Sequence, residues 1–425
     1  MKHTVYEHKL GCGAKGLIIN VPGSAVINLR VTFNSGFQFS DPASYEVPHI
    51  MEHLLATVTK HHSKPNAFMI EAQKNGAYVN ASTSADTNEY VYEFADFELD
   101  RMLDLIEEQV AEPFFDETAF QAEKSNVREE LTRNTTQHMS VCAIALAEQA
   151  FPKQWKNYET RIEQLGGIGL EQLESHYRQT HTAGNARFYA AGEFADGGEA
   201  VAARFERIFS RLEGGHRLPL TRAIGQGKAN PIVISRDIDQ LYYRTGVYFG
   251  DLTEHERAAL SLLRMLMVGG MGSRVLGEAR RRGLAYAVGA VGHSEPGNSS
   301  FGFSGYVTPE HAADLFEVIG RSMAAVEAGE CTKLELDAAK NLLVGSITRS
   351  TQTAGDILQW YVDRYDDEGV IRDFEDGLAE LRTVTTDDIT ALSQDISTSQ
   401  PRGICLVGRL EAVEAGRLAQ QFAQA

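Results

Sequence analysis

The order of predicted elements repeats along this chain, and this repeat restricts the fold more than any single motif does. A strand in residues 25–37 is followed by a helix that begins near Pro48, by two strands separated by the turn ADT, and by two helices. After residue 231 the same order returns: strand, helix, strand pair, helix pair. We therefore predict an α+β fold with two homologous domains, each an antiparallel sheet with helices packed on one face.

The boundary between the two repeats is predicted from local composition. Residues 212–231 (LEGGHRLPLTRAIGQGKANP) are rich in Gly and Pro and show no apolar periodicity. We therefore expect a first domain at residues 1–215, a linker at residues 216–230 and a second domain at residues 231–425. A chain of 425 residues is long enough to form two separate hydrophobic cores.

Charge, hydropathy and cysteine spacing exclude several classes of protein. With 58 acidic and 40 basic side chains, the formal net charge of -18 argues against nucleic acid or an anionic membrane as the main partner. No run of about 18 apolar residues is present, so no transmembrane helix is predicted, and the N-terminus does not have the pattern of a signal peptide. The four cysteines are far apart and form no CxxC pair, which favours free thiols in a cytoplasmic compartment.

Residues 49–53 read HIMEH and are the strongest candidate for chemistry. On a helix, His49 and His53 are separated by four residues and project from the same face, so that their imidazole nitrogens can bind one metal ion. Glu52 lies close to that face but is angled away from it. A carboxylate there is better placed to accept a proton from a metal-bound water than to act as a third ligand. The alternative interpretation is a chance pair of histidines on an ordinary helix.

A catalytic zinc site needs a third protein ligand, and the helix predicted to begin near Asp116 offers candidates. Glu123 and Glu130 are seven residues apart and share one helix face, whereas Glu129 points about 100° away from Glu130 and is expected in solvent. A charged outer face is the alternative interpretation of these glutamates. From the residues alone, Glu123 and Glu130 both remain candidates.

The order of these motifs resembles the pitrilysin/insulinase family of zinc metallopeptidases, whose HxxEH motif inverts the commoner HExxH. The sequences HIMEH, NASTS and NVREELT match the first half of the family pattern, and GGMGSRVLGEARRRGLAYAV is similar to its Gly-rich segment in the second half. The resemblance covers essentially the whole chain. The length of this chain is similar to that of half-size members of the family, such as bacterial peptidases related to the mitochondrial processing peptidase.

The resemblance implies a role for each matching residue of the first half. His49, His53 and Glu130 would bind one Zn²⁺ per chain, and Glu52 would be the general base. Glu123 would orient a ligand histidine, a task that metal-bound imidazoles usually require.

The resemblance also implies residues that contact a peptide substrate. Asn80 and Ala81 would lie on an edge strand that pairs with the substrate backbone. Tyr286 and an arginine of ARRRG would reach the substrate carbonyl from the second half. Many members have this arginine seven residues before the tyrosine, where this chain has alanine, so Arg280 and Arg281 are both candidates.

The function implied by the resemblance is that of a zinc-dependent endopeptidase acting on peptides or unfolded polypeptide segments. Only the first domain would bind metal, because the second half has ALSLLRML at the matching place, and the second domain would bind substrate. Two such chains, or this chain and a homologous half-size subunit, would form a dimer that encloses a chamber. The alternative is a non-catalytic or regulatory subunit of a peptidase heterodimer, although such subunits typically lack the metal motif.

Overall fold

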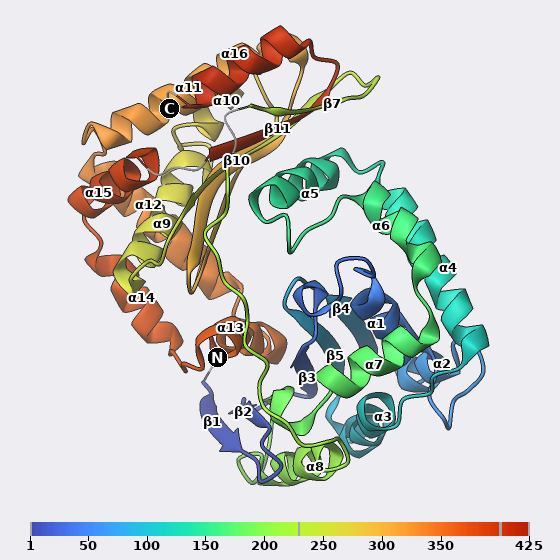
Figure 1. Cartoon of the computed structure of the whole chain (residues 1–425). Coiled ribbons are helices and arrows are strands. Elements are labelled where there is room, and N and C mark those ends of the chain that lie inside the picture. Colours follow the sequence, from blue (N-terminus) through green and yellow to red (C-terminus); the bar gives the residue numbers. More distant parts are fainter. Residues whose placement is uncertain (1, 228–229, 399–401, 424–425) are drawn as a thin grey trace. The chain divides into compact units, whose positions relative to one another are not determined.

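The chain divides into two compact units, neither of which is contiguous in sequence (Figure 1). The computed structural model describes residues 2–227, 230–398 and 402–423. Unit 1 comprises Met1–Arg133, Tyr158–Thr221 and Ser350–Gly369, and unit 2 comprises Asn134–Asn157, Arg222–Arg349 and Val370–Ala425. Each unit thus includes a segment from the other half of the chain. The domain boundary at residues 216–230 stays a prediction, and residues 213–227 form no helix or strand.

Unit 1 is built on a six-stranded sheet with the strand order β1-β2-β6-β3-β5-β4. The strands are β1 (Thr4–Lys9), β2 (Lys15–Asn20), β3 (Val26–Asn34), β4 (Tyr78–Thr83), β5 (Thr87–Ala95) and β6 (Ala186–Gly192). The helices are α1 (Val47–Thr57), α2 (Ala67–Gln73), α3 (Leu99–Ala111), α4 (Glu117–Asn134), α6 (Tyr158–Gln164), α7 (Leu170–Thr180), α8 (Glu199–Phe209) and α13 (Ala354–Glu368). Short 3-10 helices lie at Phe37–Phe39, Asp96–Glu98, Leu165–Gly167 and Ala183–Asn185.

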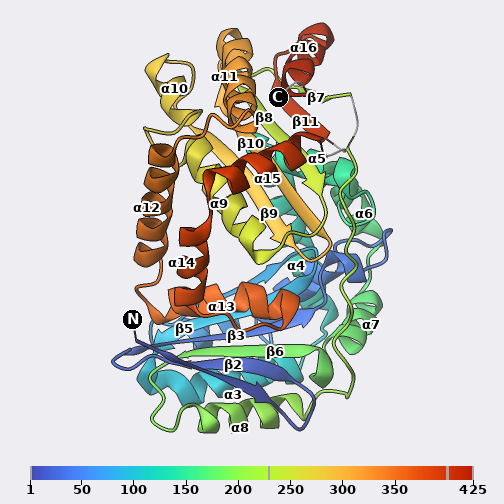
Figure 2. The same cartoon turned by 90° about the vertical axis from the view of Figure 1, so that its left-hand side faces the viewer.

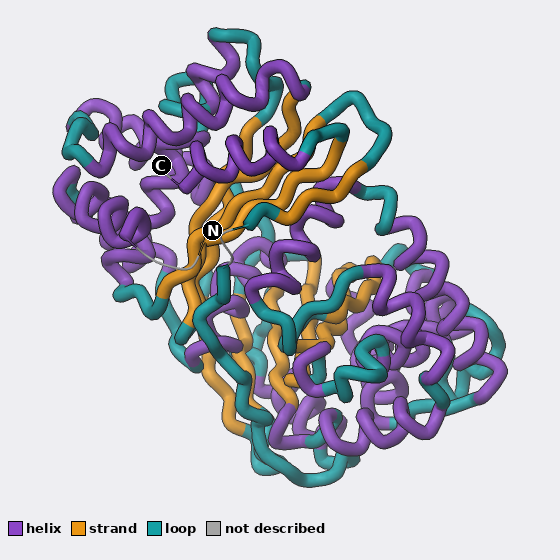
Figure 3. Tube along the Cα trace, turned by 45° about the horizontal axis from the view of Figure 1, so that its top comes forward, coloured by secondary structure: helices purple, strands orange, loops and turns teal. Residues whose placement is uncertain are grey.

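Unit 2 is built on a five-stranded sheet with the strand order β7-β11-β8-β10-β9. The strands are β7 (Ile232–Ser235), β8 (Leu241–Phe249), β9 (Val288–Glu295), β10 (Asn298–Val307) and β11 (Arg402–Gly408). The helices are α5 (His138–Ala150), α9 (Glu254–Val268), α10 (Leu276–Arg281), α11 (Pro309–Glu327), α12 (Lys333–Arg349), α14 (Phe374–Thr383), α15 (Thr386–Thr398) and α16 (Ala412–Ala423). Strands of each unit lie side by side in Figure 3, where they are orange.

Apart from the extra strand β1 in unit 1, the two sheets share one strand order, which confirms the predicted α+β class with two homologous halves. In unit 1, β6 lies between β2 and β3, parallel to the first and antiparallel to the second. In unit 2, β11 has the same relation to β7 and β8. Each predicted antiparallel sheet therefore contains one parallel pair. The reason is that β6 and β11 enter their sheets after several helices, and such a crossover permits a parallel neighbour where a hairpin does not.

A single helix from the other half of the sequence covers the second face of each sheet. In unit 1, α13 packs on β3 and β6, and Figure 2 shows it on the side of the strands opposite to α3 and α8. In unit 2, α5 packs on β8 and β11. The sheets therefore have helices on both faces and not, as predicted, on one. The contact of α13 with its sheet includes a buried hydrophobic cluster: Leu17, Ile19, Val21, Tyr189 and Ala191 from the strands, and Ala354, Ile357, Leu358, Tyr361, Val362 and Tyr365 from the helix.

The two helices that carry the candidate site form where the sequence predicts them. Pro48 lies in the first turn of α1, where its missing N–H group has no intrahelical partner to lose. The α1 helix packs against β4 and α7, and its apolar side chains Ile50 and Leu54 are fully buried. Asp116 caps α4, because its Oδ1 accepts a hydrogen bond of 2.9 Å from the N–H of Ala119. Across the described parts of the chain, no helix combines the length and the apolar character of a membrane span.

Candidate metal centre

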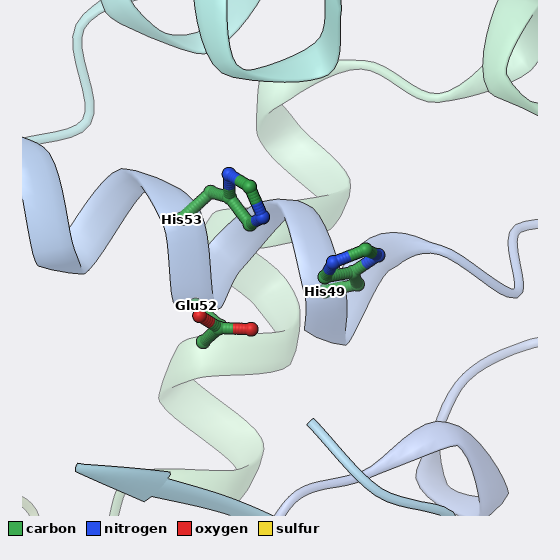
Figure 4. A group of neighbouring side chains, drawn as sticks. All are labelled: His49, Glu52 and His53. Carbon is green, nitrogen blue, oxygen red and sulfur yellow. The ribbon is translucent and has the colours of Figure 1, made fainter. Parts of the chain in front are cut away.

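The two histidines and the glutamate of HIMEH converge on the same side of α1. Figure 4 shows the rings of His49 and His53 and the carboxylate of Glu52 on neighbouring turns of this helix. One donor atom from each of the three side chains can be chosen so that all lie within 4.8 Å of one another. His49 and Glu52 are buried, and His53 is half-buried. Buried ionisable groups are costly unless they are paired, so this helix carries a feature that core packing does not explain.

Glu130 on α4 faces both imidazole rings. Its Oε2 lies 3.7 Å from Nε2 of His49 and 3.6 Å from Nε2 of His53. These contacts hold the pKa of Glu130 well below its usual value, although partial burial opposes the shift. Glu129 is exposed, as predicted. Two nitrogens and one carboxylate oxygen are the donors of many catalytic zinc sites, so the residues present fit a zinc ion.

Glu52 and Glu130 both lie beside the histidine pair, but their surroundings differ. Burial raises the pKa of Glu52, and the nearby charges of His53 and His49 and a hydrogen bond offset this only in part. The hydrogen bond is donated by the hydroxyl of Thr83 at 3.0 Å. Glu130, by contrast, is half-exposed and points its oxygen at both Nε2 atoms. The direct contact with both rings favours Glu130 over Glu52 as the third donor.

The second nitrogen of His53 is held by Glu123. Oε2 of Glu123 lies 3.3 Å from Nδ1 of His53 and accepts a hydrogen bond of 3.0 Å from Nδ2 of Asn126. Burial opposes ionisation of Glu123, but these two contacts lower its pKa below the usual value. Burial also lowers the pKa of His53, whereas Glu123 and Glu130 more than offset it and raise that pKa to about 10. The predicted role of Glu123 is compatible with this arrangement.

The second nitrogen of His49 is held by a residue that the sequence reasoning missed. Oε2 of Glu46 lies 2.8 Å from Nδ1 of His49, and Nη2 of Arg161 donates to the same oxygen at 3.2 Å. Burial lowers the pKa of His49, but Glu130 and Glu46 outweigh it and raise the pKa to about 9. The i, i+3 spacing of Glu46 and His49 was a visible signal. No comparable signal pointed to Arg161, because this residue lies on α6, far from Glu46 in the sequence.

The residues predicted to pair with a peptide backbone lie on the outermost strand of the unit 1 sheet. Asn80 and Ala81 are paired with β5 on one side of β4. Within the described residues, no other strand pairs with the opposite side of β4. Asn80 is exposed and Ala81 half-buried. The predicted edge strand is therefore present, and its last residue, Thr83, is the one that donates to Glu52.

The predicted residues of the second half lie together in unit 2. Nη1 of Arg280 donates a hydrogen bond of 3.1 Å to the carbonyl oxygen of Tyr286, and its guanidinium carbon lies 4.4 Å from the centre of the tyrosine ring. Arg281 instead pairs with Glu278 at 2.7 Å. Arg280 is thus the arginine that contacts Tyr286. Tyr286 is 75% exposed, and its role toward a substrate stays a prediction.

Two family models match successive parts of the chain. Residues 17–162 match the model described as "Insulinase (Peptidase family M16)", and residues 167–343 match the model described as "Peptidase M16 inactive domain". The first match includes HIMEH together with Glu46, Glu123 and Glu130. The second match contains Arg280 and Tyr286.

Individual relatives and solved structures agree with these matches. An uncharacterized zinc protease of Streptomyces coelicolor is 22% identical over 426 residues, covering 98% of this chain and 92% of that protein. An uncharacterized zinc protease of Mycobacterium leprae is 24% identical, covering 82% of this chain and 79% of that protein. The crystal structure of a protease from Helicobacter pylori has the same fold, with a TM-score of 0.85 at 18% identity, covering 96% of this chain and 99% of that one.

Proposed function

Because this chain belongs to the insulinase family, peptidase family M16, we propose that it is a zinc-dependent endopeptidase that hydrolyses peptides or unfolded polypeptide segments. One observation carries the proposal: Oε2 of Glu130 lies 3.7 and 3.6 Å from the Nε2 atoms of His49 and His53, with Glu52 beside them. Two relatives that are named zinc proteases support it.

In this proposal His49, His53 and Glu130 hold one Zn²⁺ ion per chain. When bound by these residues, a zinc ion would supply Lewis-acid chemistry, lowering the pKa of a water molecule and polarising the scissile carbonyl group. Glu52 accepts a proton from the water and passes it to the leaving amine. Thr83 holds the carboxylate of Glu52 in place by its hydrogen bond. Glu123, which accepts a hydrogen bond from Asn126, holds the ring of His53.

The substrate is proposed to bind as an extended strand along β4. The edge of a sheet presents unpaired N–H and C=O groups, and an extended peptide can satisfy them by adding a further strand. Asn80 and Ala81 lie in the middle of this edge. Tyr286 and Arg280 are proposed to contact the substrate carbonyl from unit 2. A dimer with a second copy or a homologous half-size subunit, and a cytoplasmic location, stay predictions of the sequence.

A non-catalytic subunit of a peptidase heterodimer is the second candidate function. The description "inactive domain" of the second matching model favours it for residues 167–343. The donors His49, His53 and Glu130 and the base Glu52 all lie outside that match and are all present. This distribution supports a chain in which the first half contains the metal donors and the general base, and the second half contains neither.

Incubation of the purified protein with a mixed peptide library, followed by mass spectrometry, tests the proposal. New peptide ends should appear with zinc present, disappear after treatment with a chelator and return when zinc is added back. The Glu52→Gln variant, prepared in parallel, controls for contaminating peptidases. A peptide pattern that is the same for the parent protein, the chelated protein and this variant would favour the non-catalytic subunit.

A further inference from the structure

Glu46 occupies the N-cap position of α1 but does not cap the helix. Short polar side chains (Ser, Thr, Asp and Asn) at this position normally accept a hydrogen bond from a backbone N–H group of the first turn. The carboxylate of Glu46 makes no such bond. It is fully buried and turns instead to Nδ1 of His49, at 2.8 Å.

The charge of Glu46 is matched by a buried arginine. Nε of Arg161 donates to Oε1 of Glu46 at 2.5 Å, and Nη2 donates to Oε2 at 3.2 Å. Arg161 is only 6% exposed. A two-pronged contact of this kind fixes the carboxylate in both distance and plane. Oε2 therefore accepts from the arginine and the histidine at once.

Three aromatic rings fix the guanidinium group in turn. Its central carbon lies 5.0 Å from the ring centre of Phe37, 5.4 Å from that of Tyr45 and 5.5 Å from that of Tyr158. The rings of Phe37 and Tyr45 are themselves stacked, with centroids 4.5 Å apart. Arginine stacks on aromatic faces in a way that lysine does not reproduce. A rigid chain of contacts thus runs from the aromatic rings through Arg161 and Glu46 to His49.

From this chain of contacts we infer that Glu46, clamped by Arg161, is a positioning residue for His49. By accepting the Nδ1–H bond, Glu46 fixes the plane of the ring and directs Nε2 toward Glu130, so that Nε2 is the nitrogen available to a metal ion once it gives up its proton. Because the carboxylate is held on the far side by Arg161, the ring is oriented before a metal ion arrives. The inference rests on the proposed zinc site and assigns to it a second oriented histidine, in addition to the Glu123–His53 pair.

The two histidines are held in different ways. The partner of His53 lies at 3.3 Å and is supported by neutral side chains, those of Asn126 and Thr57. The partner of His49 lies at 2.8 Å and is supported by a buried charge. Carboxylates that orient metal-bound histidines typically contribute 10–100-fold to metal affinity. We expect Glu46 to contribute in this range.

The test uses variants of the full chain. Glu46→Gln places an amide N–H group against the N–H donors around it and leaves Arg161 buried without its anion, which can unfold the protein. The double variant Glu46→Met with Arg161→Met removes both charges; methionine has nearly the length of glutamate and is an unbranched apolar side chain shorter than arginine. Glu98→Met with Arg101→Met is the matched control, since it removes another ion pair of unit 1 that contacts none of the proposed ligands.

Three measurements are needed: zinc dissociation constants by chelator competition, the visible absorption of the Co²⁺ form, and the cooperativity of thermal unfolding. The double variant should unfold cooperatively, bind zinc about 10–100-fold more weakly than the parent and show an altered Co²⁺ spectrum. The control should match the parent in zinc affinity and spectrum. At saturating zinc, the double variant should differ from the parent in kcat and not in KM, because Glu46 is proposed to act through His49 and not on the substrate.

Every other outcome of these measurements contradicts either the role of Glu46 or the proposed function. A folded double variant with parental zinc affinity and an unchanged Co²⁺ spectrum would overturn the role of Glu46 and leave the zinc peptidase intact. Loss of cooperative unfolding in both Glu46 variants would assign the pair to stability alone. A parent protein that takes up no zinc at all would overturn the proposed function itself, together with this inference.

Discussion

The hydroxyl group of Thr83 donates a hydrogen bond of 3.0 Å to the carboxylate of Glu52. The direction of this bond is set by Asn88, whose side-chain amide donates to Oγ1 of Thr83 at 2.7 Å, so that the hydroxyl hydrogen is available to Glu52. Thr83 is also the last residue of the edge strand β4. The proposed general base is therefore held by the same strand that is proposed to bind the substrate.

Replacement of Thr83 by valine should lower kcat while zinc content stays unchanged. Valine has nearly the same shape but cannot donate a hydrogen bond, and a bond to a charged group contributes about 1.5–3 kcal/mol. A loss of about tenfold or somewhat more in kcat is expected. Steady-state kinetics with a fluorogenic peptide measure it. An unchanged kcat would show that burial alone positions Glu52.

Replacement of Glu52 by glutamine should abolish most of the activity and leave zinc binding and folding intact. The two side chains have nearly the same size, but an amide cannot accept a proton from water. Loss of general-base catalysis costs about 10²–10⁴-fold in rate. Turnover, zinc content and thermal unfolding should be measured on one preparation. Peptide cleavage close to the parental rate would contradict the role of Glu52.

Glu130 and its neighbour Glu129 provide a matched pair of variants for the third ligand. Glu130→Gln should lose zinc during dialysis, because the carboxylate that faces both Nε2 atoms is removed. Glu129→Gln changes the net charge equally, and we expect it to retain about one zinc per chain. Elemental analysis of both variants gives the answer directly. Equal zinc loss in both would mean that the wrong glutamate is assigned.

Zinc uptake at pH 7 should release about two protons per ion. The pKa values of His49 and His53 are raised to about 9 and about 10, so both rings are protonated at pH 7 in the metal-free protein. A metal ion binds only the neutral ring, and each histidine must give up its proton. Zinc affinity should therefore increase as the pH rises from 7 toward 9. Calorimetry in buffers of different ionisation enthalpy counts the protons, and a count near zero would mean that the metal-free rings are neutral.

The first half of the chain should not fold stably when the chain is cut in the predicted linker. A fragment of residues 1–221 lacks α13, whose apolar residues Ile357, Leu358 and Tyr361 are buried against the sheet. Each buried side chain of this size contributes about 1.5–3 kcal/mol, and the sum is comparable with the whole stability of a domain. Joining residues 350–369 to the fragment through a flexible linker should restore cooperative unfolding, as measured by circular dichroism. Equal stability with and without α13 would contradict this expectation.

The sequence predicts local structure and the ends of the site helices well, because the signals are local. Pro48, Asp116 and the spacing of His49 and His53 each act within one or two helical turns. Strand β1 was not predicted, since none of its side chains is buried and it has no apolar alternation. Periodicity shows that a face is apolar, but it does not identify the segment that covers that face. For this reason the sequence did not predict the exchange of α5 and α13, in which each of these helices packs on the sheet formed mainly by the other half of the chain.

The difference between local signals and contacts of distant segments also explains which parts of the site were predicted. Within the helix, the HIMEH spacing identifies the histidine pair and places Glu52 beside it. The choice of Glu130 over Glu123 came from the family resemblance, because the seven-residue spacing leaves both on one face. The contact between Glu46 and Arg161 joins residues 115 positions apart, and no local pattern connects them.

The exchange of α5 and α13 affects how the protein is made on the ribosome. Unit 1 includes residues up to Gly369, so most of the chain must be synthesised before its sheet can be covered. At about 5–20 residues per second, this takes roughly 20–75 s. Until then the apolar side chains of Leu17 and Ile19, and that of Tyr189 once it is synthesised, have no cover from the helix that buries them in the finished protein. The nascent chain therefore depends on chaperones or on a low rate of aggregation until the helix emerges, although the metal ligands have been translated long before.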